Sequence, residues 1–224
     1  MQLKKSQDFL LKLSRHNNRE WFHDNKGFYQ AARAEFLDFA EGLIEGMKTF
    51  TEMGDIRAKD CMYRIQRDIR FSPNKTPYNT HFSLMLSPEG RKTRLAPYYF
   101  RLKPDEHSLL AGGVWEGKAA MINMIRQEID YGLEEFVGII EAPEFIKYFG
   151  QMQGQSLKRI PKGYEEDHPR LDLIKKKQFL LFHYFEANDC LKPDFQQMVL
   201  ERLQAMKPFL DFLNVPLREY WGDQ

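Results

Sequence analysis

The sequence is poor in the features that mark secreted, membrane-spanning and uniformly basic proteins. Its 224 residues include two cysteines, Cys61 and Cys190, far fewer than the disulfide framework of a small secreted domain. No apolar run reaches the roughly 20 residues that span a bilayer. The 33 lysines and arginines nearly balance the 32 acidic residues, which argues against a uniformly basic nucleic-acid coat protein. We therefore expect a cytoplasmic protein with free thiols and no membrane partner.

The common catalytic and cofactor-binding motifs are also missing. The six histidines form no H-E-x-x-H, H-x-H or Cys/His cluster, so we expect no metal site. There is no G-x-G-x-x-G, no P-loop and no G-x-S-x-G, and we expect no bound cofactor. Cys61 lies near basic residues, but a buried structural thiol is the commoner role for such a cysteine. The remaining candidates for chemistry are charged side chains.

Apolar residues are plentiful and predict one folded domain over residues 1–224. They make up 42% of the chain and include 18 phenylalanines, which is enough to fill a core at this length. Spacings of three and four residues predict helices in the first fifty residues, after Gly117 and near the C-terminus. Ser6 and Asn18 are the predicted N-caps of the first two helices, and Pro193 is placed in the first turn of the last.

Short runs between prolines and glycines predict strands instead. They lie at residues 62–65, 81–86, 97–103, 109–115 and 179–185. Because these strands are segregated from the helices, we predict an α+β fold. Its mostly antiparallel sheet comes from the middle of the chain and is packed by N- and C-terminal helices.

The near-neutral total charge hides one strongly basic segment. Residues 57–103 contain eleven lysines or arginines and three acids, a net charge of +8, so the rest of the chain carries −7. Such a concentration of positive charge suggests an anionic partner. The alternative is a solvated sheet face that needs no partner.

Within this segment three arginines recur at every third position. Arg64, Arg67 and Arg70 each present planar paired donors that match phosphate or carboxylate oxygens. Aromatic residues interleave with them, a combination that suits nucleotides or single-stranded nucleic acid unless the rings fill the core. We predict an anion-binding module whose partner is an anionic small molecule or a nucleic acid. Its ligand-binding residues would be Arg64, Arg67, Arg70, Lys75 and Tyr78.

Two other interpretations of the same segment stay open. The protein could be an enzyme acting on a phosphorylated or carboxylated small molecule, with Asp68 or His81 as the general base and the arginines stabilising developing negative charge. Alternatively, it could be a non-catalytic scaffold in which Arg64, Arg67 and Asp68 form an internal network.

The arginine-rich stretch resembles a signature of domain-of-unknown-function family 2461, F-R-I-x-R-D-x-R-F-S-x-D-K-x-P-Y-K. The matching residues are Arg64, Ile65, Arg67, Asp68, Arg70, Phe71, Ser72, Lys75, Pro77 and Tyr78. Further similar segments lie at residues 17–22, 112–115, 158–164 and 168–169. The chain departs from the pattern at Asn74, Asn79 and Ala111, where the family usually has Asp, Lys and Gly. The resemblance implies a single α+β domain and no particular activity.

Overall fold

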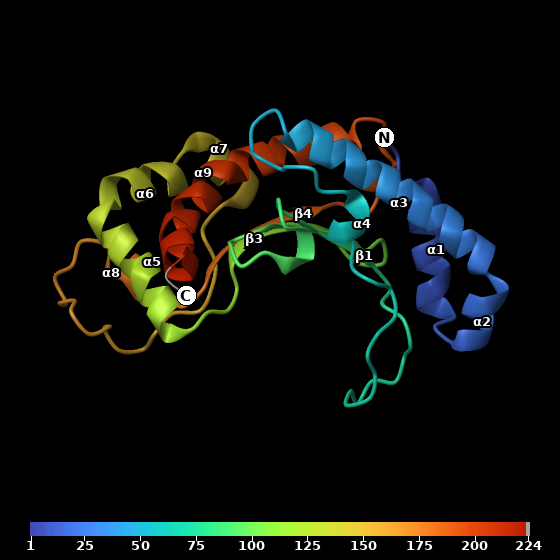
Figure 1. Cartoon of the computed structure of the whole chain (residues 1–224), viewed down its shortest axis with the longest axis horizontal. Coiled ribbons are helices and arrows are strands. Elements are labelled where there is room, and N and C mark those ends of the chain that lie inside the picture. The colour runs from blue at the N-terminus through green and yellow to red at the C-terminus, as the bar shows by residue number, and fades with distance from the viewer. Residues whose placement is uncertain (223–224) are drawn as a thin grey trace. The chain divides into compact units, whose positions relative to one another are not determined.

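The computed structural model describes residues 1–222 (Figure 1). Along the chain, helices and strands occur mostly in separate groups. The first helices are α1 (Lys4–Arg15), α2 (Arg19–Asp24), α3 (Lys26–Met47) and α4 (Ala58–Cys61). After the first three strands come α5 (Ala119–Tyr131), α6 (Leu133–Ile140), α7 (Pro143–Phe149) and α8 (Leu171–Ile174). A last helix, α9, spans Phe195–Gly222. Two short 3-10 helices are η1 (Gly90–Lys92) and η2 (Asp189–Leu191).

Four strands form one antiparallel sheet in the order β1-β2-β3-β4. They are β1 (Phe82–Leu86), β2 (Tyr98–Leu102), β3 (Ser108–Val114) and β4 (Phe179–Phe185). Helices from both ends of the chain flank these strands, which confirms the predicted α+β class. No helix among residues 1–222 is long and apolar enough to cross a membrane.

The described chain groups into two compact units, and neither is continuous in sequence. Unit 1 comprises Met1–Lys92, Tyr99–Leu110 and Tyr184–Gln204. Unit 2 comprises Thr93–Tyr98, Ala111–His183 and the described residues from Ala205 onward. Strands β2, β3 and β4 and helix α9 each contribute residues to both units. That one domain spans residues 1–224 stays a prediction.

Phenylalanines fill the core of unit 1. Phe36 and Phe39 lie on the buried face of α3, three residues apart, because that spacing returns a side chain to the same side of a helix. Phe36 packs on Phe82 of β1 at 5.1 Å between ring centroids, and Phe39 packs on Phe195 of α9 at 5.7 Å. Each such ring pair stabilises the fold by about 1 kcal/mol beyond the free energy gained by burying its apolar surface.

A second aromatic cluster fills the core of unit 2. Phe136 of α6 lies 4.8 Å from Phe212 of α9, and Phe145 of α7 lies 6.0 Å from Phe209 of α9. Phe136, Phe145 and Phe209 are almost completely buried. The high phenylalanine content is therefore used mainly for packing in both units.

Several local predictions are wrong in detail. Ser6 is not an N-cap, because α1 begins at Lys4 and the buried Ser6 hydroxyl donates to the carbonyl of Ala32 on α3 at 2.9 Å. Residues 62–65 form no strand, and Met62 makes only an isolated bridge with Leu84. Pro193 lies before α9 rather than in its first turn. Asn18 is confirmed as the N-cap of α2, since its side-chain oxygen accepts a hydrogen bond from a backbone N–H of the first turn.

Candidate functional site

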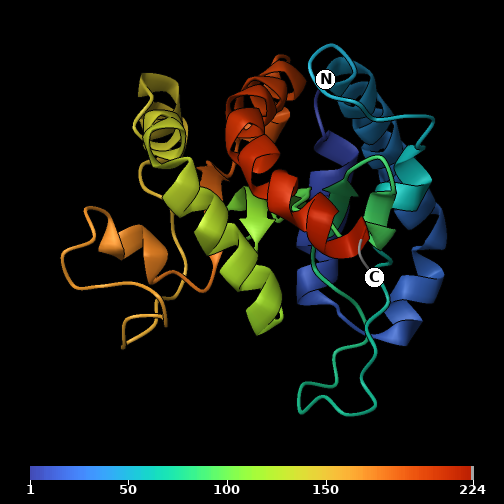
Figure 2. The ribbon, with the colours of Figure 1, turned by 60° about the vertical axis from the view of Figure 1, so that its left-hand side comes forward.

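Most of the predicted site residues lie in a hairpin arm, residues 66–78. The arm lies between α4 and β1 in the sequence and projects away from both (Figures 1 and 2). The backbone N–H of Arg67 donates to the carbonyl of Pro77 at 3.0 Å, and an isolated bridge joins Gln66 to Tyr78. Tyr78 closes the arm, because its ring stacks on Phe22 at 4.0 Å. The Asn17 side chain also bonds both its backbone N–H and its carbonyl. The contacts of Tyr78 therefore fix the end of the arm against Asn17 and Phe22.

Four of the charged residues predicted for the site bond within the arm. The Arg67 guanidinium donates to the hydroxyl and the carbonyl of Thr76. Lys75 Nζ donates to the carbonyl of Ile69 at 3.0 Å. Arg70 forms a two-pronged ion pair with Asp68, at 3.0 Å and 2.7 Å. Arg70 and Lys75 line none of the pockets described in this structure and organise the arm instead.

Two adjoining pockets of unit 1 gather the remaining candidates. The arm-base pocket has a volume of about 430 Å³ and is lined by Tyr63, Arg64, Gln66, Arg67, Asp68, Asn79, His81, Ser83 and Tyr99. The side pocket has a volume of about 300 Å³ and is lined by Tyr29, Arg33, Lys59, Met62, Tyr63, Arg64, Gln66 and Arg91. Three residues are common to both, namely Tyr63, Arg64 and Gln66. The arm-base pocket thus brings together Arg64 and Arg67 with Asp68 and His81, whereas Arg70, Lys75 and Tyr78 lie outside its lining.

The lining of these basic pockets is strongly positive. The two linings together contain five basic side chains and one carboxylate. The carboxylate is that of Asp68, which is already bonded to Arg70. Hydrogen bonds from Arg70 hold the pKa of Asp68 below its usual value, so this carboxyl stays ionised. Arg64 is exposed, and within residues 1–222 it forms no hydrogen bond or ion pair with another residue. Its guanidinium is therefore available to an external anion.

His81 lies in the arm-base pocket as a neutral imidazole. Burial, helped by the positive charges of Arg101 and Lys103, lowers the pKa of His81 to about 4. A general base works best when its pKa lies near the working pH, and neither His81 nor the ionised Asp68 meets that condition. The arrangement suits holding an anion better than moving protons.

Sequence reasoning missed three basic residues of the side pocket. Arg33 comes from α3, Lys59 from α4 and Arg91 from η1. Lys59 and Arg91 belong to the basic segment, but nothing in their spacing links them to Arg64. Arg91 is held in place because its Nε donates to the carbonyl of Asp60 at 3.0 Å and its guanidinium lies 5.9 Å from the Tyr63 ring.

Neither cysteine lines the basic pockets. Burial raises the pKa of both Cys61 and Cys190 to about 11, so neither is an activated thiolate. Within the described residues, no group of three or more histidine, cysteine, aspartate or glutamate side chains could hold a metal ion.

The fold and site define an α+β protein with paired basic pockets at the base of a hairpin arm. The chain belongs to the family described as "Conserved hypothetical protein (DUF2461)", whose model matches residues 5–212. This match confirms the resemblance that the arginine-rich motif indicates. No curated protein and no solved structure matches the chain.

Proposed function

We propose that unit 1 binds a phosphorylated ligand in the two basic pockets, with Arg64 as the central contact. The observation that carries the proposal is the position of Arg64, which lines both pockets and forms no hydrogen bond or ion pair with another described residue. A guanidinium matches two phosphate oxygens at once, and a charged hydrogen bond of this kind contributes about 2 kcal/mol.

The polar and aromatic lining supports a phosphate ester rather than a bare anion. The neutral imidazole of His81 and the hydroxyl of Ser83 supply hydrogen-bond donors without adding negative charge. Tyr63 and Tyr99 add aromatic surface, with their rings 6.4 Å apart. Since bases stack on aromatic side chains, a nucleotide would use both kinds of contact. The phosphate could come from a free nucleotide or from a nucleic-acid strand.

Calorimetry with inorganic phosphate, adenosine monophosphate and a short single-stranded oligonucleotide distinguishes these sources. We expect the nucleotide to bind more tightly than inorganic phosphate, because only the nucleotide can use the aromatic surface. A strand that follows several basic side chains would show an affinity that falls steeply with salt. Failure of all three ligands to bind at low salt would refute the proposal.

A matched pair of variants tests the role of Arg64. Arg64→Gln and Lys92→Gln each remove one positive charge from the basic segment, but only Arg64 lines the pockets. We expect Arg64→Gln to weaken binding by about tenfold or more, the equivalent of a lost charged hydrogen bond. Lys92→Gln should change affinity by no more than about twofold, because Lys92 is exposed and a single exposed charge is largely screened. Equal effects would mean that net charge alone attracts the ligand.

We also infer a cytoplasmic location. The support is chemical: Cys61 and Cys190 are separate, buried thiols, as a reducing compartment favours.

A further inference from the structure

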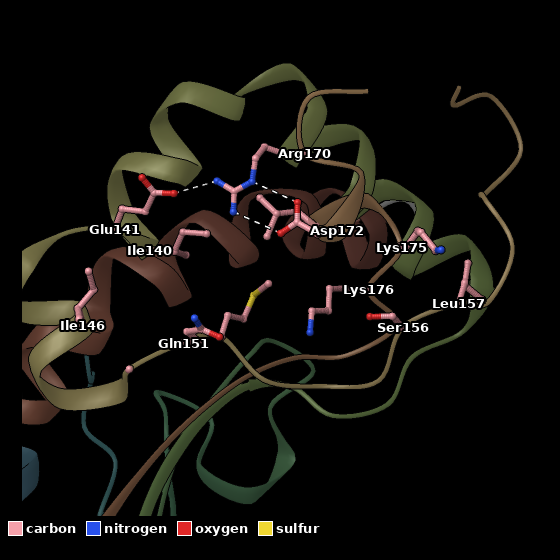
Figure 3. Close-up of a pocket in the computed structure, with 13 residues that line it drawn as sticks. Ile140, Glu141, Ile146, Gln151, Ser156, Leu157, Arg170, Asp172, Lys175 and Lys176 are labelled. Atoms are coloured by element: carbon pink, nitrogen blue, oxygen red, sulfur yellow. Dashed lines mark hydrogen bonds and ion pairs between the residues drawn. The ribbon is translucent and has the colours of Figure 1, made fainter. Parts of the chain in front are cut away.

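A third pocket, of about 680 Å³, lies within unit 2 and has a different character (Figure 3). It is bounded by the ends of α6 and α7, by the segment that follows Gly150, and by α8 with the residues just after it. Its volume is in the range of pockets that bind small organic molecules. None of its lining residues belongs to the basic pockets of unit 1.

One part of this pocket is apolar. Ile140 and Ile146 come from α6 and α7, and Figure 3 shows them on the same side of the pocket. Leu157 and the buried Leu173 add further hydrocarbon surface. Ile146 is 54% exposed, so it would lose water contact if an apolar molecule covered it.

The two acidic side chains of the pocket share one cationic partner. Arg170 lies between them, with one nitrogen 3.0 Å from Glu141 Oε1 and another 3.2 Å from Asp172 Oδ1 (Figure 3). Both carboxylates therefore have a cationic partner inside the pocket.

Two lysines supply the remaining charge. Lys175 and Lys176 line the pocket, and within residues 1–222 neither has a carboxylate partner. Lys176 Nζ donates to the carbonyl of Gly154 at 3.1 Å, which fixes one of its three donor positions. With three basic and two acidic side chains, the lining carries a net charge of +1.

We propose that this pocket binds an organic carboxylic acid with an apolar body. The carboxylate would be held by Lys176, whose ammonium lies toward the middle of the pocket in Figure 3, and the hydrocarbon part would lie against Ile140 and Ile146. A monoanion matches the net charge of the lining, and its apolar body matches the side chains of Ile140 and Ile146, beside which the carboxylate of Glu141 is paired with Arg170. This site is independent of the phosphate site in unit 1.

Three small ligands test the proposal by calorimetry with the full chain. Octanoate has both the carboxylate and the apolar body, octanol keeps the body without the charge, and acetate keeps the charge without the body. We expect octanoate to bind about tenfold or more tightly than either of the others, since each lacks one of the two contacts. Equal binding of octanoate and octanol, or no binding of octanoate at millimolar concentration, would overturn it.

Three consecutive lysines provide the matched variants. Lys176→Gln should weaken octanoate binding severalfold, whereas Lys177→Gln should leave it unchanged, because Lys177 is exposed and lies outside the lining. Lys175→Gln should have a smaller effect than Lys176→Gln, because the Lys175 ammonium lies at the far side of the pocket beside Leu157 (Figure 3). Thermal melting of each variant checks that unit 2 stays folded, and Lys176→Arg, which keeps the positive charge and hydrogen-bond donors, should retain binding. An equal loss of affinity in Lys177→Gln would show that the local charge, rather than this pocket, attracts the ligand.

Discussion

Arg64 and Arg70 differ in what they bond, although the sequence presents them as equivalent members of a three-residue repeat. Arg70 is satisfied by Asp68 two residues away, and Arg67 by Thr76 across the arm. Arg64 has no such partner in the described chain and faces two pockets. The repeat therefore holds two arginines that bond within the arm and one that does not.

Tyr78 is expected to matter for stability more than any other predicted ligand residue. Its ring stacks on Phe22 at 4.0 Å with an interplanar angle of 13°, and Asn17 bonds its backbone. Tyr78→Ala should lower the free energy of unfolding by about 2 kcal/mol in urea titrations. Phe71→Ala, which removes a ring that is 94% exposed in the same arm, should change it by less than about 0.5 kcal/mol. The assignment fails if the two variants are equally stable.

His81 should make the protein less stable in mild acid. The unfolded imidazole has a pKa of about 6.5, whereas burial lowers the pKa of folded His81 to about 4. Between these values the unfolded state binds a proton that the folded state cannot, so stability falls as pH decreases from 6.5 to 4.

Urea titrations of wild-type protein and His81→Asn at pH 7 and pH 4.5 measure this effect. The wild-type protein should lose about 2 kcal/mol more than the variant over this range, allowing for the partial exposure of the ring. Equal losses would show that His81 is not the responsible group.

The hairpin arm shows where prediction from the sequence fails. Strand β4 appears at the residues that its local pattern predicts, Phe179–Phe185. The arm does not, because its shape depends on bonds such as that from Arg67 to Thr76, which no periodicity reveals. Ser6 fails for the same reason, since Ala32, 26 residues away, accepts its hydroxyl hydrogen bond.

The candidate site was predictable in part. Arg64, Arg67, Asp68 and His81 are close in sequence and meet in one pocket. Arg33 and Arg91 reach the adjoining pocket only because α3 and η1 pack near α4 in the folded unit. A local motif therefore identifies one wall of the site, and the tertiary fold supplies the other.

Strand β3 has one position at which only glycine fits. Gly113 has a φ of +119°, and a Cβ there would lie 1.9 Å from the carbonyl oxygen of Phe179 in β4. Gly113→Ala should therefore destabilise unit 2 by about 3 kcal/mol or more, measured as a lower melting temperature. Gly138→Ala is the control, because Gly138 lies in α6 with open space around it and should gain up to about 1 kcal/mol. Similar melting temperatures for the two variants would contradict this geometry.

The charge asymmetry of the whole chain belongs largely to unit 1. Of the eleven basic residues in segment 57–103, ten lie in unit 1, and Arg94 lies in unit 2. The net charge of +1 is thus an average over very different surfaces. It does not describe the field that an approaching anion would meet at the basic pockets.

The two cysteines should report on the opening of unit 1, which contains both. Their burial and raised pKa values, about 11, predict almost no reaction with Ellman's reagent in the native protein at neutral pH. Labelling should rise with denaturant along the same curve as the loss of circular dichroism. Native protein that reacted as fast as free cysteine would show that these thiols are accessible.

The discontinuity of the two units has a consequence for how such a protein can evolve. Each unit is assembled from three separate stretches of chain, and β2, β3, β4 and α9 pass from one to the other. A gene fragment that encoded one unit alone would cut through strands of the sheet. Recombination therefore cannot exchange or discard either unit as a module, and the basic pockets of unit 1 and the third pocket, in unit 2, are inherited together.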